Sequence, residues 1–356
     1  MSIRKNSKAL DFDGQRFDIG IDTHDRNWSV TIRSNKMLLK KFSMNPSSRE
    51  LSSYMNRHYP GGEYYSVYEA GFCGYWIYRE LTESGIKNII VNPADVPTTN
   101  KEKIGKRDPI DSNKLSRELG NGSLECIFIP TPHQQAIRSL SRLRFQQSKR
   151  SRQVKNYIKE FLHFNGIRIP VEYGGRHWSR NFIRWLQALK FEQEQNRQTL
   201  DLLLVQYGDA RKSQLDILRV LRKYASTNET IHLLRTIPGI GFVTAFTLYA
   251  ELLDIKRFSK FDKLAAIIGL IPEVKSTDDK QWTKGIASRK SVYLRYLLVE
   301  AAWIAIRKDP VLTKSFSDLT RRMTKNNAII RIAKKLLSRV RYVWANQKPY
   351  VLGIVE

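Results

Sequence analysis

Residues 16–23 alternate apolar and polar positions with the two-residue period of a half-buried strand, and four more strand-like runs follow in the N-terminal third of the chain. In the run RFDIGIDT, Phe17, Ile19 and Ile21 alternate with polar or small residues. Helical stretches follow the third, fourth and fifth of the strand-like runs RFDIGIDT, RNWSVTIRS, MLLKKFSM, YYSVYEA and NIIVNP. The order of three strands, helix, strand, helix, strand, helix predicts an α/β domain with a ribonuclease H-like layout over residues 1–125.

From about Thr131 the apolar spacing becomes helical, among many Arg and Lys residues. The pattern predicts one long basic helix, a turn between Pro170 and Gly175, and a second long helical region, so residues 126–230 are expected to form an antiparallel coiled-coil arm. Residues 231–356 are helical in pattern again, and we expect them to be all-helical. The predicted fold class is therefore α/β plus all-α, in three parts.

The chain carries 61 Lys and Arg against 34 Asp and Glu, a net charge of +27. Such a surplus predicts a polyanionic partner but leaves enzymes and simple nucleic-acid binders equally open. No apolar stretch reaches the roughly 18 residues of a membrane span, and the N-terminus lacks the apolar core of a signal peptide, so we expect a cytoplasmic protein without a membrane partner. Cys73 and Cys126 fit neither a disulfide framework nor a zinc motif, and both are expected in a core.

Four carboxylates fall where the predicted sheet would bring them together. Asp22 ends the first strand, Glu69 ends the fourth, and Asp108 and Asp111 lie three apart on the helix after the fifth strand, where they share a face. Carboxylate oxygens suit hard divalent cations, and two Mg²⁺ ions about 4 Å apart can assist phosphoryl transfer. The alternative is structural, because Asp-Pro-Ile-Asp is also a good helix start.

Several segments carry a resemblance to a known family: IGIDTH, YEAGFCGYWIYREL, VNPADVPTTNKEKIGKRDPIDSNKLSREL, and a C-terminal region that begins LLRTIPGIGFVTAF and includes KGIASRKSVYLRYLLVEAAW. They resemble the bacterial insertion-sequence transposases of the IS110 family, relatives of the pilin-gene DNA invertases. The resemblance implies a RuvC-like N-terminal domain whose Asp22, Glu69, Asp108 and Asp111 bind Mg²⁺, and a C-terminal serine transposase domain.

The resemblance also implies that Ser276 is the nucleophile and forms a covalent phosphoserine link to DNA. Transesterification of this kind needs no ATP, in agreement with the lack of a G-x-x-x-x-G-K-[ST] loop. The sequence departs from the family pattern at Thr277, where Gly is common, and at Ser291-Val292, where a Gly-Asn pair is common. Ser288 and Ser291 are the neighbouring hydroxyls that could take the role instead.

Nucleic-acid contacts are expected from two further groups of residues. The segment Ile237–Gly241 resembles a helix-hairpin-helix turn, in which backbone amides near Gly239 and Gly241 face a phosphate, although tight helix packing explains the glycines equally well. Cationic side chains shortly after Ser276 are expected to hold phosphates of the substrate, namely Lys284, Arg289, Lys290 and Arg295.

The resemblance implies donor and target DNA as substrates, a structured noncoding (bridge) RNA as guide, and a bacterial, nucleoid-associated location. Two strand exchanges need at least two active sites, so we expect a dimer or tetramer. Three alternatives to a transposase remain: a site-specific DNA invertase with the same chemistry, a Holliday-junction-type metal-dependent nuclease in which Ser276 is dispensable, and a non-catalytic nucleic-acid-binding protein.

Overall fold

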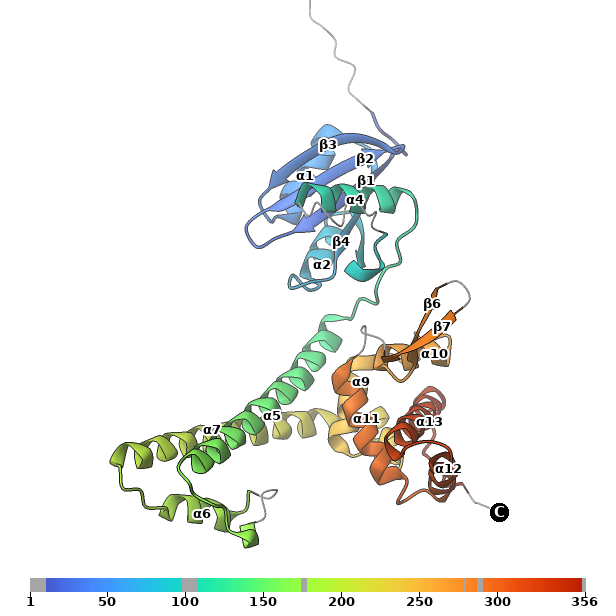
Figure 1. The fold of residues 1–356 in the computed structure, drawn as a ribbon. Helices are drawn as coiled ribbons and strands as arrows, with labels where there is room; N and C mark the ends of the chain where they lie inside the picture. The colour runs from blue at the N-terminus through green and yellow to red at the C-terminus, as the bar shows by residue number, and fades with distance from the viewer. Residues whose placement is uncertain (1–10, 98–107, 174–177, 278–279, 287–290, 354–356) are drawn as a thin grey trace, which may run out of the picture. The chain divides into compact units, whose positions relative to one another are not determined.

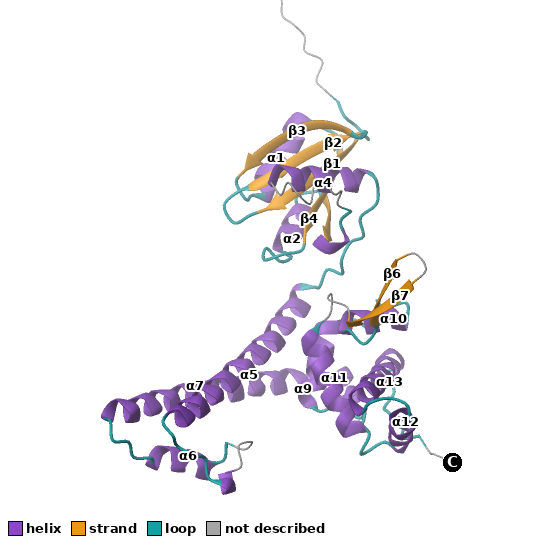
Figure 2. Cartoon of the chain, viewed as in Figure 1, coloured by secondary structure: helices purple, strands orange, loops and turns teal. Residues whose placement is uncertain are grey.

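The computed structural model describes residues 11–97, 108–173, 178–277, 280–286 and 291–353 (Figure 1). The chain divides into two compact units, Met1–Ile129 and Pro130–Glu356. The first holds a mixed α/β sheet, and the second is mostly helical (Figure 2). None of the described helices is both long and apolar enough to cross a membrane.

The N-terminal unit is built on a five-stranded sheet of order β3-β2-β1-β4-β5. The first three strands are antiparallel to one another, whereas β4 and β5 continue the sheet parallel to β1. The strands are β1 Arg16–Thr23, β2 Trp28–Ser34, β3 Met37–Met44, β4 Glu63–Glu69 and β5 Lys87–Val91. This confirms the predicted order of strands and helices, which is that of a RuvC-like domain.

Helices cover both faces of this sheet (Figure 1). The helices are α1 Ser48–His58, α2 Trp76–Glu83, the short η1 Pro93–Asp95 and α4 Asp108–Gly120. Phe17, Ile19 and Ile21 of β1 are fully buried in the core under α1 and α2. On the other face α4 lies directly against β1. The two are so close at Gly20 that a Cβ atom there would come within 2.0 Å of the Ser112 carbonyl oxygen. Glycine at position 20 is what permits this close approach.

The second unit begins with two long helices that pack against each other, α5 Pro132–Phe164 and α7 Glu194–Ala225. The side chain and backbone of Thr131 form a capping box with Gln134 that starts α5. The second predicted helical region is interrupted, which corrects the expectation: α6 Arg180–Ala188 ends before α7 begins, with η2 Val171–Tyr173 preceding it. Arg197 stabilises the break by donating hydrogen bonds to the carbonyls of Leu186 and Leu189.

The remaining helices are α8 Glu229–Leu234, α9 Phe242–Leu252, α10 Phe261–Ile268, α11 Val292–Ala305, α12 Pro310–Thr320 and α13 Lys325–Asn346. Ile137 of α5 and Leu221 of α7 share one hydrophobic core with them. The base of the two long helices is thus part of the C-terminal core, and a separate arm bounded at residues 126 and 230 stays a prediction.

The expectation of an all-helical C-terminal part is wrong at one place. β6 Pro272–Thr277 and β7 Lys280–Ile286 pair as an antiparallel hairpin between α10 and α11 (Figure 2). Both segments contain β-branched or aromatic residues, which favour strands: Val274, Thr277, Trp282, Thr283 and Ile286. A second correction concerns the cysteines: Cys73 is buried, but Cys126 is exposed.

Candidate acidic active site and nucleic-acid interface

The strand register places Asp22 and Glu69 side by side at one edge of the sheet. β1 and β4 are parallel with Ile21 opposite Tyr68, so Asp22 and Glu69 come next at the carboxyl ends of the two strands. Asp22 is two residues beyond Gly20, whose open side faces α4, and therefore points to the same face. Glu69 is likewise two residues beyond Val67, which lies in the core between the sheet and α4. Both carboxylates thus lie on the α4 side.

The first turns of α4 are fastened to β2 by side-chain hydrogen bonds. The buried hydroxyls of Thr31 and Ser112 are 2.9 Å apart, and Arg33 donates to Asn113 Oδ1 at 2.8 Å. Both contacts join residues about eighty positions apart in the sequence, and neither could be foreseen from it. They hold the N-terminal half of α4, and with it Asp111, over the sheet face that carries Asp22 and Glu69.

Lys114 brings two of the predicted metal ligands to one point. Its Nζ lies 3.2 Å from Asp111 Oδ1 and 3.5 Å from Glu69 Oε1, so the two carboxylate oxygens cannot be further apart than the sum of these distances. The Lys114 side chain is only 8% exposed, whereas Glu69 and Asp111 are 32% and 40% exposed. The ammonium group therefore neutralises a pair of carboxylates that remain open to solvent on their other side.

Sequence reasoning missed Lys114, although a signal was present. Lys114 follows Asp111 by three residues, which is the spacing of neighbours on a helix face, and the same spacing had been used only to pair Asp108 with Asp111. The burial of Lys114 depends on the strand-end carboxylate of Glu69 and the helical carboxylate of Asp111, because an ammonium group is costly to bury without ionic partners.

The other two predicted metal ligands are Asp22, near the end of β1, and Asp108, at the start of α4. Asp22 Oδ2 lies 3.4 Å from His24 Nε2, and the Asp22 side chain is 23% exposed. Asp108 begins α4, but its side chain lies outside the described residues. Over the part of the chain that the structure describes, no three His, Cys, Asp or Glu side chains converge on a single point. The structure thus joins Glu69 and Asp111 through Lys114 and sets Asp22 at the neighbouring strand end.

The predicted nucleophile lies on the C-terminal hairpin. Ser276 is the fifth residue of β6 and lies opposite Gln281 of β7. Lys284 of β7 lies opposite Glu273 of β6. The side chains of residues 272–290 lie outside the described residues, and so do Ser288, Arg289 and Lys290 altogether. Ser291 is the N-cap residue of α11, since its hydroxyl accepts a hydrogen bond from the Leu294 amide at 3.3 Å.

The two glycines of the Ile237–Gly241 turn differ in their surroundings. Gly239 has φ +85° and lies so close to α11 that a Cβ atom would come within 2.2 Å of the Ala301 carbonyl oxygen, which supports the packing explanation. Gly241 precedes α9 and has open space beside it, so a phosphate contact there stays a prediction.

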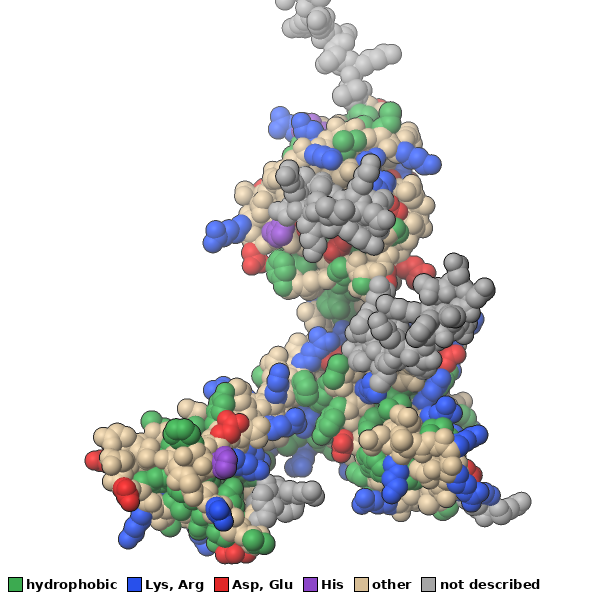
Figure 3. All heavy atoms as spheres, viewed as in Figure 1, with side chains coloured by type: hydrophobic (Ala, Val, Ile, Leu, Met, Phe, Trp, Pro, Cys, Tyr) green, Lys and Arg blue, Asp and Glu red, His purple; other side chains and the backbone are tan. Residues whose placement is uncertain are grey.

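Arg295 lies on α11 and lines a surface hollow with Tyr296, Trp303 and Ile330. Burial lowers the pKa of the Arg295 guanidinium from its usual value, although such a group stays charged at neutral pH. Lys and Arg side chains are spread over the visible face of this unit around α12 and α13 (Figure 3). The charge surplus of the sequence is thus partly displayed on the C-terminal helices.

Two family models match separate parts of the chain. A DEDD transposase domain of the IS110 type matches residues 19–165, and the model described as "Transposase IS116/IS110/IS902 family" matches residues 231–317. The first range contains all four predicted acids and the second contains Ser276.

Several proteins named as transposases are similar to this chain over most of its length. The Sinorhizobium fredii protein y4qE, named as a transposase, is 27% identical over 67% of this chain and 58% of its own length. The transposase for insertion sequence element IS1111A of Coxiella burnetii is 26% identical over 80% of this chain and 78% of its own length. The transposase for element IS1533 of Leptospira borgpetersenii is 24% identical, over 80% and 84% respectively. The chain thus belongs to the IS116/IS110/IS902 family of transposases.

Proposed function

We propose that the protein is a DNA transposase that cuts and rejoins DNA through a covalent phosphoserine intermediate, using Asp22, Glu69, Asp108 and Asp111 as metal ligands and Ser276 as nucleophile. The observation that carries the proposal is the shared position of Asp22, Glu69 and Asp111 on the α4 face, at the carboxyl ends of β1 and β4. Family membership supports it, because the DEDD domain match covers these acids.

The chemistry of these side chains fits a divalent cation. The match to a DEDD domain suggests dependence on a divalent metal, and partly exposed carboxylates are the ligands that Mg²⁺ prefers. When bound, the metal would stabilise negative charge on the oxygens of the reacting phosphate. Asp22, Glu69 and Asp111 would hold it, with Asp108 as the expected fourth ligand. Without metal, the Lys114 ammonium group pairs with Glu69 and Asp111 and offsets the repulsion between them.

The step assigned to Ser276 is a phosphoryl transfer. The Ser276 hydroxyl gives up its proton, its Oγ forms a bond to phosphorus, and one P–O bond of the DNA backbone breaks as the leaving oxygen takes a proton. Attack by a hydroxyl of a second DNA strand reverses the step and releases Ser276. Each exchange replaces one phosphodiester by another, so no external energy source is needed.

The partners belong to the same proposal. Donor and target DNA are the substrates, a structured noncoding RNA guides target choice, and two or four copies of the chain assemble so that several strands can be exchanged. The net charge of +27 supports long contacts with phosphate backbones, because neutralising phosphates releases counterions.

A covalent-capture assay tests the mechanism. The full chain is coexpressed with the flanking noncoding RNA of its element, incubated with labelled donor and target DNA and Mg²⁺, and separated on a denaturing gel. The wild type should give a protein-linked DNA band that is lost in Ser276→Ala and falls more than about 100-fold in Asp22→Asn, since metal stabilisation of the transition state is removed. Ser288→Ala, which removes a neighbouring hydroxyl, should keep the band.

Other outcomes favour the alternatives. Loss of the band in Ser288→Ala but not in Ser276→Ala would move the nucleophile. Cutting without any adduct, equal in wild type and Ser276→Ala, would favour a nuclease that uses metal and water. DNA binding without cutting, unchanged in Asp22→Asn, would favour a non-catalytic binder. Inversion of a segment between two sites on one DNA, with no insertion elsewhere, would favour an invertase.

A further inference from the structure

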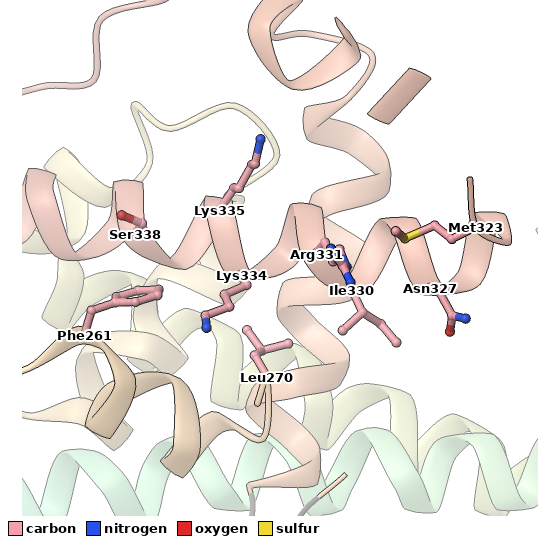
Figure 4. Close-up of a pocket in the computed structure, with 9 residues that line it drawn as sticks. All are labelled: Phe261, Leu270, Met323, Asn327, Ile330, Arg331, Lys334, Lys335 and Ser338. Atoms are coloured by element: carbon pink, nitrogen blue, oxygen red, sulfur yellow. The ribbon is translucent and has the colours of Figure 1, made fainter. Parts of the chain in front are cut away.

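A groove between α10 and α13 combines an apolar floor with positive charge. It has a volume of about 680 Å³, and Leu270, Ile330 and Met323 provide its apolar surface. Arg331, Lys334 and Lys335 of α13 also line it, and no carboxylate of the described residues does. We call this surface the α10–α13 groove (Figure 4).

An aromatic ring and a cation meet within the groove. Figure 4 shows the Lys334 side chain between Phe261 and Leu270. The Lys334 Nζ lies 5.7 Å from the centre of the Phe261 ring and 3.4 Å from Asp262 Oδ1. The ion pair with Asp262 is solvent-exposed and therefore weak, because water screens both charges. Lys334 can exchange it for a stronger anionic partner without leaving a buried charge behind.

A nucleotide matches this combination of surfaces. A base presents a flat, mostly apolar face that stacks on aromatic and aliphatic side chains, and its phosphate pairs with Arg and Lys. The groove volume falls in the range of about 300–1,000 Å³ found for small-molecule sites. Such a space admits an unpaired nucleotide but not a base-paired helix.

The groove is close in the chain to the proposed nucleophile. Leu270 precedes Ser276 by six residues, and an extended chain of that length spans at most about 20 Å. The groove also borders the hollow lined by Arg295, because Ile330 belongs to both. A nucleic-acid strand held at Ser276 can therefore reach both surfaces.

We propose that the α10–α13 groove binds one unpaired nucleotide of the DNA strand that flanks the phosphate attacked by Ser276. The base lies on Leu270, Ile330 and Phe261, and the phosphate pairs with Arg331 and Lys334. The identity of the strand rests on the proposed function, whereas the ability of the groove to bind an unpaired deoxynucleotide does not.

Photo-crosslinking locates the nucleotide directly. The full chain is irradiated with a single-stranded oligodeoxynucleotide that contains 5-iododeoxyuridine, and the crosslinked peptides are identified by mass spectrometry. We expect crosslinks in the peptides that contain Phe261 and Met323, and we expect them also in Ser276→Ala, since binding in the groove needs no nucleophile. Crosslinks that map only to other parts of the chain would overturn the proposal.

Variants test the two halves of the groove. Phe261→Leu keeps an apolar side chain but removes the ring, and should weaken crosslinking roughly 5-fold or more. The double variant Arg331→Ala/Lys334→Ala should reduce the slope of the salt dependence of oligonucleotide affinity by about 0.7, since one phosphate contact on a single strand is lost. The matched control is Arg307→Ala/Lys308→Ala, which removes the same charges from exposed positions outside the groove and should leave the groove crosslinks intact. Equal loss of these crosslinks in both double variants would contradict the assignment.

Two comparisons separate this inference from its alternatives. An oligoribonucleotide of the same sequence that displaces the DNA from the groove at equal or lower concentration would overturn the commitment to DNA. If the serine adduct never forms but the groove crosslinks persist, the proposed function fails and the nucleotide site stands. If the adduct forms and the crosslinks map elsewhere, the groove assignment fails and the proposed function stands.

Discussion

Each unit of the molecule buries a charged side chain that pairs with groups of the opposite charge, Asp309 in the C-terminal unit and Lys114 in the N-terminal unit, but the two are enclosed to different degrees. In the C-terminal unit Asp309 is fully buried. Its Oδ1 accepts hydrogen bonds from the Val311 and Leu312 amides at 3.0 and 3.2 Å, and its Oδ2 accepts one from the Tyr350 hydroxyl at 2.5 Å, with Arg339 Nε at 3.7 Å. In the N-terminal unit Lys114 is also buried, but its partners Glu69 and Asp111 are about one third exposed.

The difference lies in how completely other protein groups enclose the buried charge and its partners. Asp309 caps the start of α12 and connects it to Arg339 of α13 and to Tyr350 of the C-terminal segment. Both of its carboxylate oxygens have protein partners. The side chains of Glu69 and Asp111, which pair with Lys114, stay 32% and 40% exposed. A closed set of donors fixes a fold, whereas a half-open set of carboxylates can still accept a cation or a substrate.

The largest effect on stability is expected from Asp309→Ala. The substitution removes the cap of α12 and leaves the Tyr350 hydroxyl and Arg339 without their buried partner, so the free energy of unfolding should fall by about 3–5 kcal/mol. Urea unfolding followed by tryptophan fluorescence measures this. Asp318→Ala removes a carboxylate from an exposed pair with Arg321 and serves as the control. Equal midpoints for the two variants would show that Asp309 is not structural.

Lys114→Met should destabilise the metal-free protein and strengthen metal binding. Without the ammonium group Glu69 and Asp111 repel each other, which should cost about 1–3 kcal/mol in EDTA. Mn²⁺ should then bind more tightly than to the wild type, because no cation competes for the same oxygens. Thermal unfolding in EDTA and titration with Mn²⁺ measure the two effects. If Mn²⁺ affinity is unchanged or weaker, Lys114 does not share oxygens with the metal.

Tyr350→Phe should cost about 1–2 kcal/mol at neutral pH, since it removes one hydrogen bond to a charged group. Burial, and then the hydrogen bond to Asp309, raise the pKa of Tyr350 above the ordinary 10.0. A group whose pKa is raised on folding adds stability below its unfolded pKa and loses it as pH rises through the folded value. The stability difference between wild type and variant should therefore be constant up to about pH 10 and narrow above it. A difference that grows above pH 10 would refute this account.

Lys87→Met is expected to have the smallest effect. Lys87 also contacts a carboxylate, Glu63 at 3.2 Å, but both side chains are about half exposed or more. Water screens such a pair, so no measurable change in unfolding midpoint is expected, with or without metal. The variant is therefore the matched control for Lys114→Met. A comparable loss in both would mean that burial does not distinguish the two lysines.

The sequence pattern predicted the secondary structure of the N-terminal domain better than that of the C-terminal part. Alternation in RFDIGIDT marked a strand because its apolar side chains Phe17, Ile19 and Ile21 all lie in the core under α1 and α2, and the order of elements then restricted the sheet to few topologies. The hairpin β6–β7 was missed because it interrupts a long helical pattern. The break between α6 and α7 was missed because it depends on Arg197, which acts from the following helix.

The sequence by itself determined the positions of Asp22 and Glu69 at strand ends, the spacing of Asp108 and Asp111, and the surplus of positive charge. Only the tertiary structure decided that Lys114 lies between Glu69 and Asp111, that Thr31 and Ser112 fasten α4 to the sheet, and that Gly239 packs against α11. The physical reason is that periodicity reports which face of one element is buried, whereas these contacts join elements far apart in the chain.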